Sequence, residues 1–234
     1  MITQYFAQPV MSTDQKLLGV EVLTKFQENV FNVLNPAPAE IMQGWSIHEK
    51  RAHLIDLIHF ISNEDEFFLE NKLFCSLNID QSTALILRHD AYIQILLQSM
   101  PYVKLQISED FIKSEQGLKN SDLKSILYGS NALFLNYLGI GNVNVKTDVS
   151  TIFEVVKIDE TLFGTQFYRS SFPVLLKDIM KYCPRIIVSG IFDTEILQYL
   201  KKWDIWGVQG EELYESMPLQ DVSTLPLIKS RNEQ

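Results

Sequence analysis

Cysteine and long apolar runs are scarce in this sequence. The two cysteines, Cys75 and Cys183, lie far apart, each in or beside an apolar segment. This arrangement predicts two buried thiols rather than a disulfide or a zinc site. No apolar run approaches the ~20 residues that a membrane-spanning helix needs, and the start of the chain lacks the basic and apolar regions of a signal peptide. We therefore expect a cytoplasmic protein that does not bind a membrane.

Positive charge is also scarce. The chain has 20 Lys and Arg against 29 Asp and Glu, which gives a formal net charge of -9. Binding to a nucleic-acid backbone needs clustered basic residues, so the composition disfavours direct nucleic-acid binding. An acidic surface is first of all a soluble one, and it also suits a basic protein partner.

The composition is otherwise ordinary for a globular chain with a large core. Apolar residues make up 46% of the 234 residues and charged residues 21%, so disorder is expected only at the ends. We expect one domain over residues 1–228 and a frayed polar tail at residues 229–234, with the segment after Leu219 only loosely held.

Common catalytic motifs are missing. His48, His53, His59 and His89 do not have the four-residue spacing of a zinc-binding helix pair, which predicts surface or half-buried structural histidines. The turn at residues 139–141 has only two glycines of a dinucleotide fingerprint. A phosphate-binding loop and a Gly-x-Ser-x-Gly elbow are both absent from the sequence.

Strands and helices alternate along most of the chain. Residues 5–11 and 17–26 predict a hairpin. The capping-box pair Ser46 and Glu49 predicts the start of a long helix. The later expected strands are 73–79, 103–107, 132–135, 153–158, 185–190 and 205–210, and further helices are expected at 80–87, 122–127, 172–182 and 194–202. This α/β order favours one (β/α) barrel after the hairpin, and a doubly wound open sheet is the alternative that periodicity does not separate from it.

Polar residues stand at the strand ends, where βα units carry their chemistry. Glu21 is the acid among them, so a divalent cation would have one carboxylate and a few neutral amides as ligands. Ser189 has no base beside it. The residues predict a polar but uncharged barrel mouth, without a catalytic or metal-binding residue. The strand-end residues are Glu21, Asn78, Gln106, Asn136, Tyr137, Lys157, Ser189 and Gln209.

Read in order, these segments resemble an EAL domain, the barrel that hydrolyses the bacterial messenger cyclic di-GMP. The resemblance covers about residues 5–219 and implies a modified TIM-type (β/α) barrel whose first strand is antiparallel. Its segments are Gln8-Pro-Val, Glu21-Val-Leu, Ser76-Leu-Asn-Ile, Leu105-Gln-Ile-Ser-Glu, Leu135-Asn-Tyr-Leu-Gly-Ile-Gly, Val156-Lys-Ile-Asp, Val188-Ser-Gly-Ile and Val208-Gln-Gly.

Matched position by position, most of the family's chemistry is missing. Glu21 and Asn78 match two metal ligands, and Lys157 and Gln209 match two further active-site residues. Glu109 matches an acid that anchors a mobile loop. The family's other acids are replaced by Gln106, Asn136, Tyr137 and Ser189, and its phosphate-gripping arginine by Lys25, which lacks the bidentate fork. The lost charge would be needed to hold Mg²⁺ and activate its water, so the resemblance implies no catalysis, no metal and no cofactor.

Within this group, residues 67–79 and 136–142 are similar to those of stand-alone degenerate members, the YdiV-type anti-FlhD factors of enteric bacteria. That similarity implies a protein that binds FlhD of the flagellar activator FlhD–FlhC and represses flagellar gene expression and motility. Two alternatives are a non-hydrolysing cyclic di-GMP sensor, with Gln8, Glu21, Lys25 and Gln209 touching the nucleotide, and a weak cyclic di-GMP phosphodiesterase.

The sequence does not locate the partner-binding surface. Trp45, Trp203 and Trp206 are candidate anchors because tryptophan is enriched at binding hot spots. The alternative interpretation is that each packs between barrel elements, and Trp206, on an expected strand, fits that interpretation best.

Overall fold

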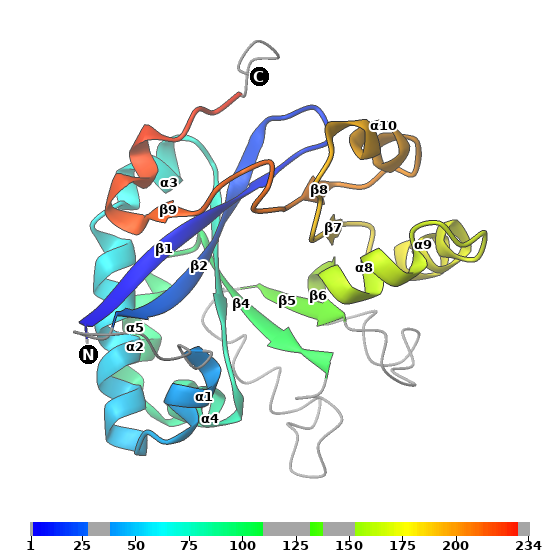
Figure 1. The fold of residues 1–234 in the computed structure, drawn as a ribbon. Coiled ribbons are helices and arrows are strands. Elements are labelled where there is room, and N and C mark those ends of the chain that lie inside the picture. Colours follow the sequence, from blue (N-terminus) through cyan, green and yellow to red (C-terminus); the bar gives the residue numbers. More distant parts are fainter. Residues whose placement is uncertain (1, 28–37, 110–131, 138–152, 229–234) are drawn as a thin grey trace.

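A computed structural model describes residues 2–27, 38–109, 132–137 and 153–228 of the chain. Its centre is a closed barrel of mixed strands (Figure 1). Strand β1 (Ile2–Met11) runs antiparallel to β2 (Leu17–Gln27) and also to β8 (Gly207–Val208), so it closes the sheet. The strands from β2 to β8 are parallel neighbours in chain order; those between are β3 (Phe74–Asn78), β4 (Val103–Ser108), β5 (Leu133–Tyr137), β6 (Phe153–Ile158) and β7 (Ile186–Val188).

This closure confirms the modified TIM-type barrel with an antiparallel first strand and rules out the open doubly wound sheet. The predicted hairpin is also correct, with Gln8 opposite Glu21 in its register. A ninth strand, β9 (Met217–Pro218), was not predicted. It pairs with Phe6 and Ala7 of β1.

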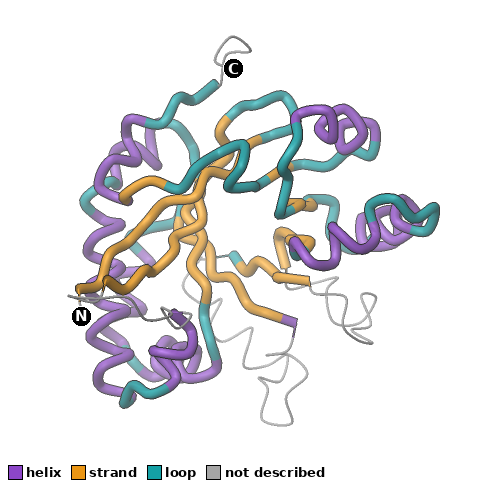
Figure 2. The backbone as a smooth tube through the Cα atoms, viewed as in Figure 1, coloured by secondary structure: helices purple, strands orange, loops and turns teal. Residues whose placement is uncertain are grey.

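The helices lie outside the strands (Figure 2). Two of the helices have local caps at their N-termini. Ser46 and Glu49 form the complete predicted capping box, and the Asp80 side chain accepts from the Thr83 N–H at 2.7 Å. The sequence analysis missed the short helices α1, α3, α5 and α8. The helices are α1 (Pro38–Gln43), α2 (Ile47–Ser62), α3 (Asp65–Glu70), α4 (Gln81–His89), α5 (Ala91–Gln98), α8 (Glu160–Gln166), α9 (Phe172–Met180) and α10 (Thr194–Lys202).

The core has two layers. The larger one fills the space between strands and helices and includes the buried face of α2, which consists of Leu54, Leu57, Ile58 and Ile61. The smaller one consists of strand residues grouped apart from that layer, and half-buried Leu18 and Trp206 pack against it. Its buried members are Val10, Phe74, Phe134, Val155 and Ile187.

Strand periodicity places a polar layer above this small apolar cluster. Phe134 and Asn136, Val155 and Lys157, and Ile187 and Ser189 are each two residues apart, so each pair shares one face of its strand. The apolar members therefore fill the lower barrel interior, and the polar members face its mouth.

The segment after Leu219 is not loosely held, contrary to the prediction. Leu219 and Val222 are almost fully buried in a 3-10 helix, η3 (Leu219–Thr224). Further on, the Leu17 N–H donates to the Leu227 carbonyl at 2.9 Å. The burial of these apolar side chains and the pairing of β9 with β1 hold the segment in place. Both depend on long-range contacts, which local sequence patterns do not predict.

Several predicted features lie outside the described residues. They are the helix at 122–127, the glycine turn at 139–141 and the polar tail at 229–234.

Both cysteines are buried free thiols, as predicted, and burial raises the pKa of Cys75 and of Cys183. None of the helices in the described parts of the chain is both long and apolar enough to cross a membrane.

The three tryptophans are half-buried, and each packs against other rings. Trp45 contacts Phe26 with ring centroids 5.4 Å apart, Trp203 contacts Phe172 at 5.8 Å, and Trp206 stacks on Phe74 at 5.7 Å. All three residues therefore pack against neighbouring elements, and a role as partner anchors stays a prediction.

Candidate functional site at the barrel mouth

Glu21 is the centre of the polar layer, and its carboxylate is almost completely buried. Its Oε1 accepts from Asn78 Nδ2 at 2.7 Å and from Gln106 Nε2 at 3.2 Å. Its Oε2 accepts from Gln209 Nε2 at 2.8 Å and from the ammonium of Lys157. The predicted strand-end residues of five strands thus meet at one carboxylate.

The strand register explains why these residues meet. Asn78 lies opposite Gln106 in the β3–β4 pair, and Asn136 lies opposite Lys157 in the β5–β6 pair. Since parallel strands end at the same edge of the barrel, their last polar residues converge there. Each contact joins residues far apart in the sequence.

Lys157 supplies the counter-charge of Glu21, and both side chains are buried. Burial alone would raise the pKa of Glu21, but the charge of Lys157 and the hydrogen bonds from Lys157, Gln209 and Asn78 outweigh it. The pKa of Glu21 is therefore held below its ordinary value, and the carboxylate stays ionised. The mouth is uncharged only in sum, because it contains a neutralised ion pair.

The remaining predicted residues are arranged differently. Three buried polar atoms have no hydrogen-bond partner among the described residues: Asn136 Oδ1, Ser189 Oγ and Gln209 Oε1. Tyr137 is the last residue of β5, where its Cα pairs with that of Ile158. Glu109, at the end of β4, is fully buried.

A divalent metal ion, for which the matching positions of EAL domains supply the ligands, does not fit this donor set. The amides of Asn78, Gln106 and Gln209 direct their NH₂ groups toward Glu21, so they act as donors and not as metal ligands. The single carboxylate is already neutralised by an ammonium group. Across the described residues, no cluster of three or more His, Cys, Asp or Glu could hold a metal ion.

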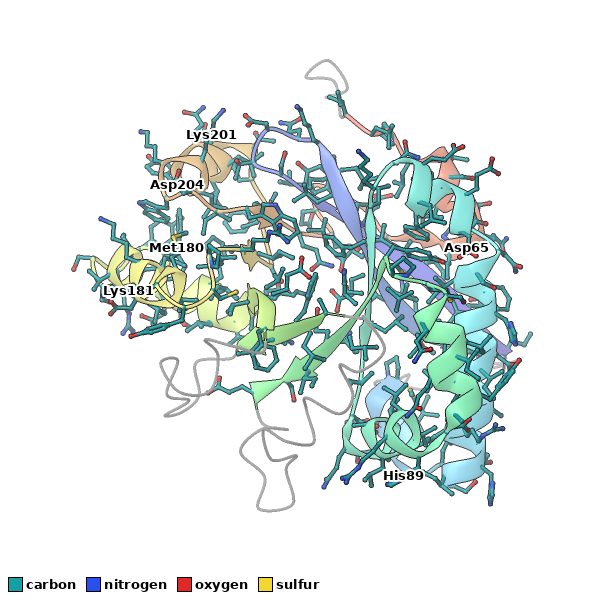
Figure 3. All side chains as sticks on the ribbon, turned by 180° about the vertical axis from the view of Figure 1, so that it is seen from behind. Asp65, His89, Met180, Lys181, Lys201 and Asp204 are labelled. Atoms are coloured by element: carbon teal, nitrogen blue, oxygen red, sulfur yellow. The ribbon has the colours of Figure 1, made fainter. Side chains whose placement is uncertain are left out.

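The histidines take no part in the mouth. His48, His59 and His89 are exposed, and Figure 3 shows His89 on the outer side of the molecule. His53 is half-buried, with Nδ1 3.2 Å from the Tyr5 hydroxyl. They are surface or half-buried side chains, as predicted.

The rim of the mouth contains Glu211 and Ser216, which the sequence analysis did not select. Glu211 Oε2 accepts from Gln8 Nε2 at 3.0 Å, and its Oε1 accepts from Ser216 Oγ at 2.9 Å. Lys25 Nζ donates to Ser216 Oγ at 3.1 Å and lies 4.0 Å from the centroid of the Phe6 ring. The sequence signal was the Glu211-Glu212 pair directly after the Val-Gln-Gly segment.

This barrel and its strand-end layer are similar to those of EAL-like domain proteins. No family model matches the chain. A solved structure titled EAL-like domain protein YdiV superposes with a TM-score of 0.80 at 24% identity, covering 97% of each chain. The chain is also similar along its length to YdiV of Escherichia coli K12, with 29% identity over 227 residues, 93% of this chain and 92% of that protein.

Two further relatives show the range of functions in the comparison. The protein named anti-FlhC(2)FlhD(4) factor YdiV in Salmonella typhimurium LT2 is 22% identical over 199 residues, which is 83% of each chain. The cyclic di-GMP phosphodiesterase PdeH of Escherichia coli K12 is 24% identical over 231 residues, 95% of this chain and 87% of that protein. The expected resemblance to YdiV-type EAL-like proteins is confirmed.

Proposed function

We propose that this protein is a catalytically inactive EAL-like regulator that binds FlhD of the FlhD–FlhC activator and represses flagellar gene expression and motility. The observation that carries the proposal is the neutralised Glu21 carboxylate, which is held by Lys157 and three amides where a hydrolase would need charged ligands. The names of the YdiV relatives support the choice of partner.

The proposed location is the cytoplasm, because the transcription activator acts there. The protein would make no direct contact with DNA or with a membrane. The net charge of -9 supports this, because it disfavours a phosphate backbone and suits a protein partner.

A complex with FlhD is the first expected result. The purified protein mixed with FlhD at micromolar concentration should elute from size exclusion as one peak containing both chains, because a repressor of this kind acts by stable association. PdeH is the matched barrel control and should elute apart from FlhD. Separate elution of this protein and FlhD would contradict the proposal.

Absence of hydrolysis is the second expected result. Incubation of cyclic di-GMP with the protein and Mg²⁺ or Mn²⁺ should yield no linear dinucleotide, because a single neutralised carboxylate neither holds the ion nor lowers the pKa of its water. PdeH, assayed in parallel, should give the product. Turnover that depends on metal and is lost in Glu21→Gln would overturn this part of the proposal.

A non-hydrolysing cyclic di-GMP sensor is the second candidate. It is favoured by the buried atoms Asn136 Oδ1, Ser189 Oγ and Gln209 Oε1, which have no hydrogen-bond partner within the described parts of the chain and which a polar ligand could satisfy. The contacts of Glu211 at the rim weigh against it, because they already use the donors of Gln8 and Ser216.

A further inference from the structure

The loop between β8 and β9 crosses the rim of the barrel mouth. It is anchored at both ends: Gly210 lies against the backbone of Ile191, and Met217 pairs with Ala7 of β1. Buried Tyr214 fixes the middle, and its N–H donates to the Gly210 carbonyl at 2.9 Å. We refer to residues 211–216 as the strap.

The strap places a carboxylate among hydrogen-bond donors. Glu211 Oε1 accepts from the backbone N–H of Ser216 at 3.0 Å and from its hydroxyl at 2.9 Å, while Oε2 accepts from Gln8 Nε2 at 3.0 Å. The Lys25 ammonium donates to the same hydroxyl at 3.1 Å and polarises it. Backbone N–H, hydroxyl and side-chain amide donors around one anion, with an ammonium group donating to the hydroxyl, also suit a phosphate group.

These contacts connect the rim to the interior. Gln8 Oε1 accepts from Gln209 Nε2 at 2.8 Å, and the same Nε2 donates to Glu21. Glu211 therefore holds Gln8 in the orientation that completes the network around the buried ion pair. Removing the Glu211 carboxylate leaves Gln8 Nε2 and the Ser216 donors free at the rim.

We propose that Glu211 is an internal oxyanion that occupies the donors of Gln8 and Ser216 at the barrel mouth and thereby excludes phosphate-bearing ligands. A phosphate entering the mouth would meet a like charge and would find its donors already used. The barrel is then closed to cyclic dinucleotides by a residue of its own chain, whatever its protein partner.

The test measures cyclic di-GMP binding by calorimetry in variants of the strap. Wild type should show no saturable heat of binding. Glu211→Gln and Glu211→Ala should show saturable heat, with an affinity at least about tenfold above the lowest affinity that the measurement detects, because one like-charge contact is removed. Inorganic phosphate should compete in the variants if the phosphate group is what the freed donors recognise; lack of competition would overturn that assignment.

Glu212→Gln is the matched control, because it removes the same formal charge from the neighbouring exposed position. It should behave as wild type. Equal affinity of wild type and both Glu211 variants, whether all bind or none does, would overturn the proposal, as would an equal gain in Glu212→Gln.

Two further measurements keep the outcomes separate. Thermal unfolding of each variant verifies that the barrel is folded, and Glu211→Gln preserves the side-chain size if Glu211→Ala does not fold. Elution with FlhD is measured in the same samples. A failed FlhD complex with gained nucleotide binding contradicts only the proposed function, and the reverse result contradicts only the inference about Glu211.

Discussion

Replacing Glu21 with alanine should lower the free energy of unfolding by about 3–5 kcal/mol, because it leaves the Lys157 ammonium buried without its counter-charge. The change also removes the acceptor of Asn78, Gln106 and Gln209. Denaturant unfolding of wild type and variant measures the difference.

Two variants control this prediction. Glu154→Gln breaks a partly exposed ion pair with Arg185 and should lower stability by less than about 1 kcal/mol. The double variant Glu21→Leu with Lys157→Met removes both charges and should recover part of the loss. A Glu21→Ala effect as small as that of Glu154→Gln would show that the buried pair does not stabilise the barrel.

The same pair gives the fold a defined acid sensitivity. The pKa of Glu21 lies lower in the folded chain than its ordinary value of 4.5, because Lys157 and the amide donors outweigh the effect of burial. Glu21 therefore contributes stability that is complete above pH 4.5, and this contribution is lost as the pH falls through the folded-state pKa. The pH profile of Glu21→Ala should be flatter than that of wild type in this range.

Replacing Gly210 with alanine should lower the free energy of unfolding by more than about 4 kcal/mol. The added Cβ would lie 1.9 Å from the carbonyl oxygen of Ile191 and 2.8 Å from its nitrogen, and both are backbone atoms. The Ile191 N–H donates to the Gln209 carbonyl at 3.0 Å, so the two segments cannot separate without losing a hydrogen bond.

Gly164→Ala is the matched control for this substitution. Gly164 lies within α8, and a Cβ added there meets no atom within 4 Å. Alanine should therefore stabilise the protein by up to about 1 kcal/mol, since it restricts the unfolded chain and favours the helix. Equal effects of the two substitutions on the thermal midpoint would contradict the close approach at Gly210.

The sequence predicted the elements whose causes are local. The capping box of Ser46 and Glu49 marked the start of α2, and the predicted helix at 194–202 coincides with α10. Glycine and proline breaks and apolar runs located most strands. The sequence analysis did not predict the short helices α5 and α8, because each has about two turns. This length is too short for a helical repeat of apolar residues to be recognised.

The sequence by itself determined the (β/α) order, the residues at the strand ends and the loss of acids there, because each follows from neighbours within a few positions. Only the tertiary structure decided what those residues do. Lys157 neutralises Glu21 across 136 positions, and Glu211 reaches Gln8 across 203. Closure of the barrel by β1 creates both contacts, and no local pattern encodes the distance between two segments so far apart in the chain.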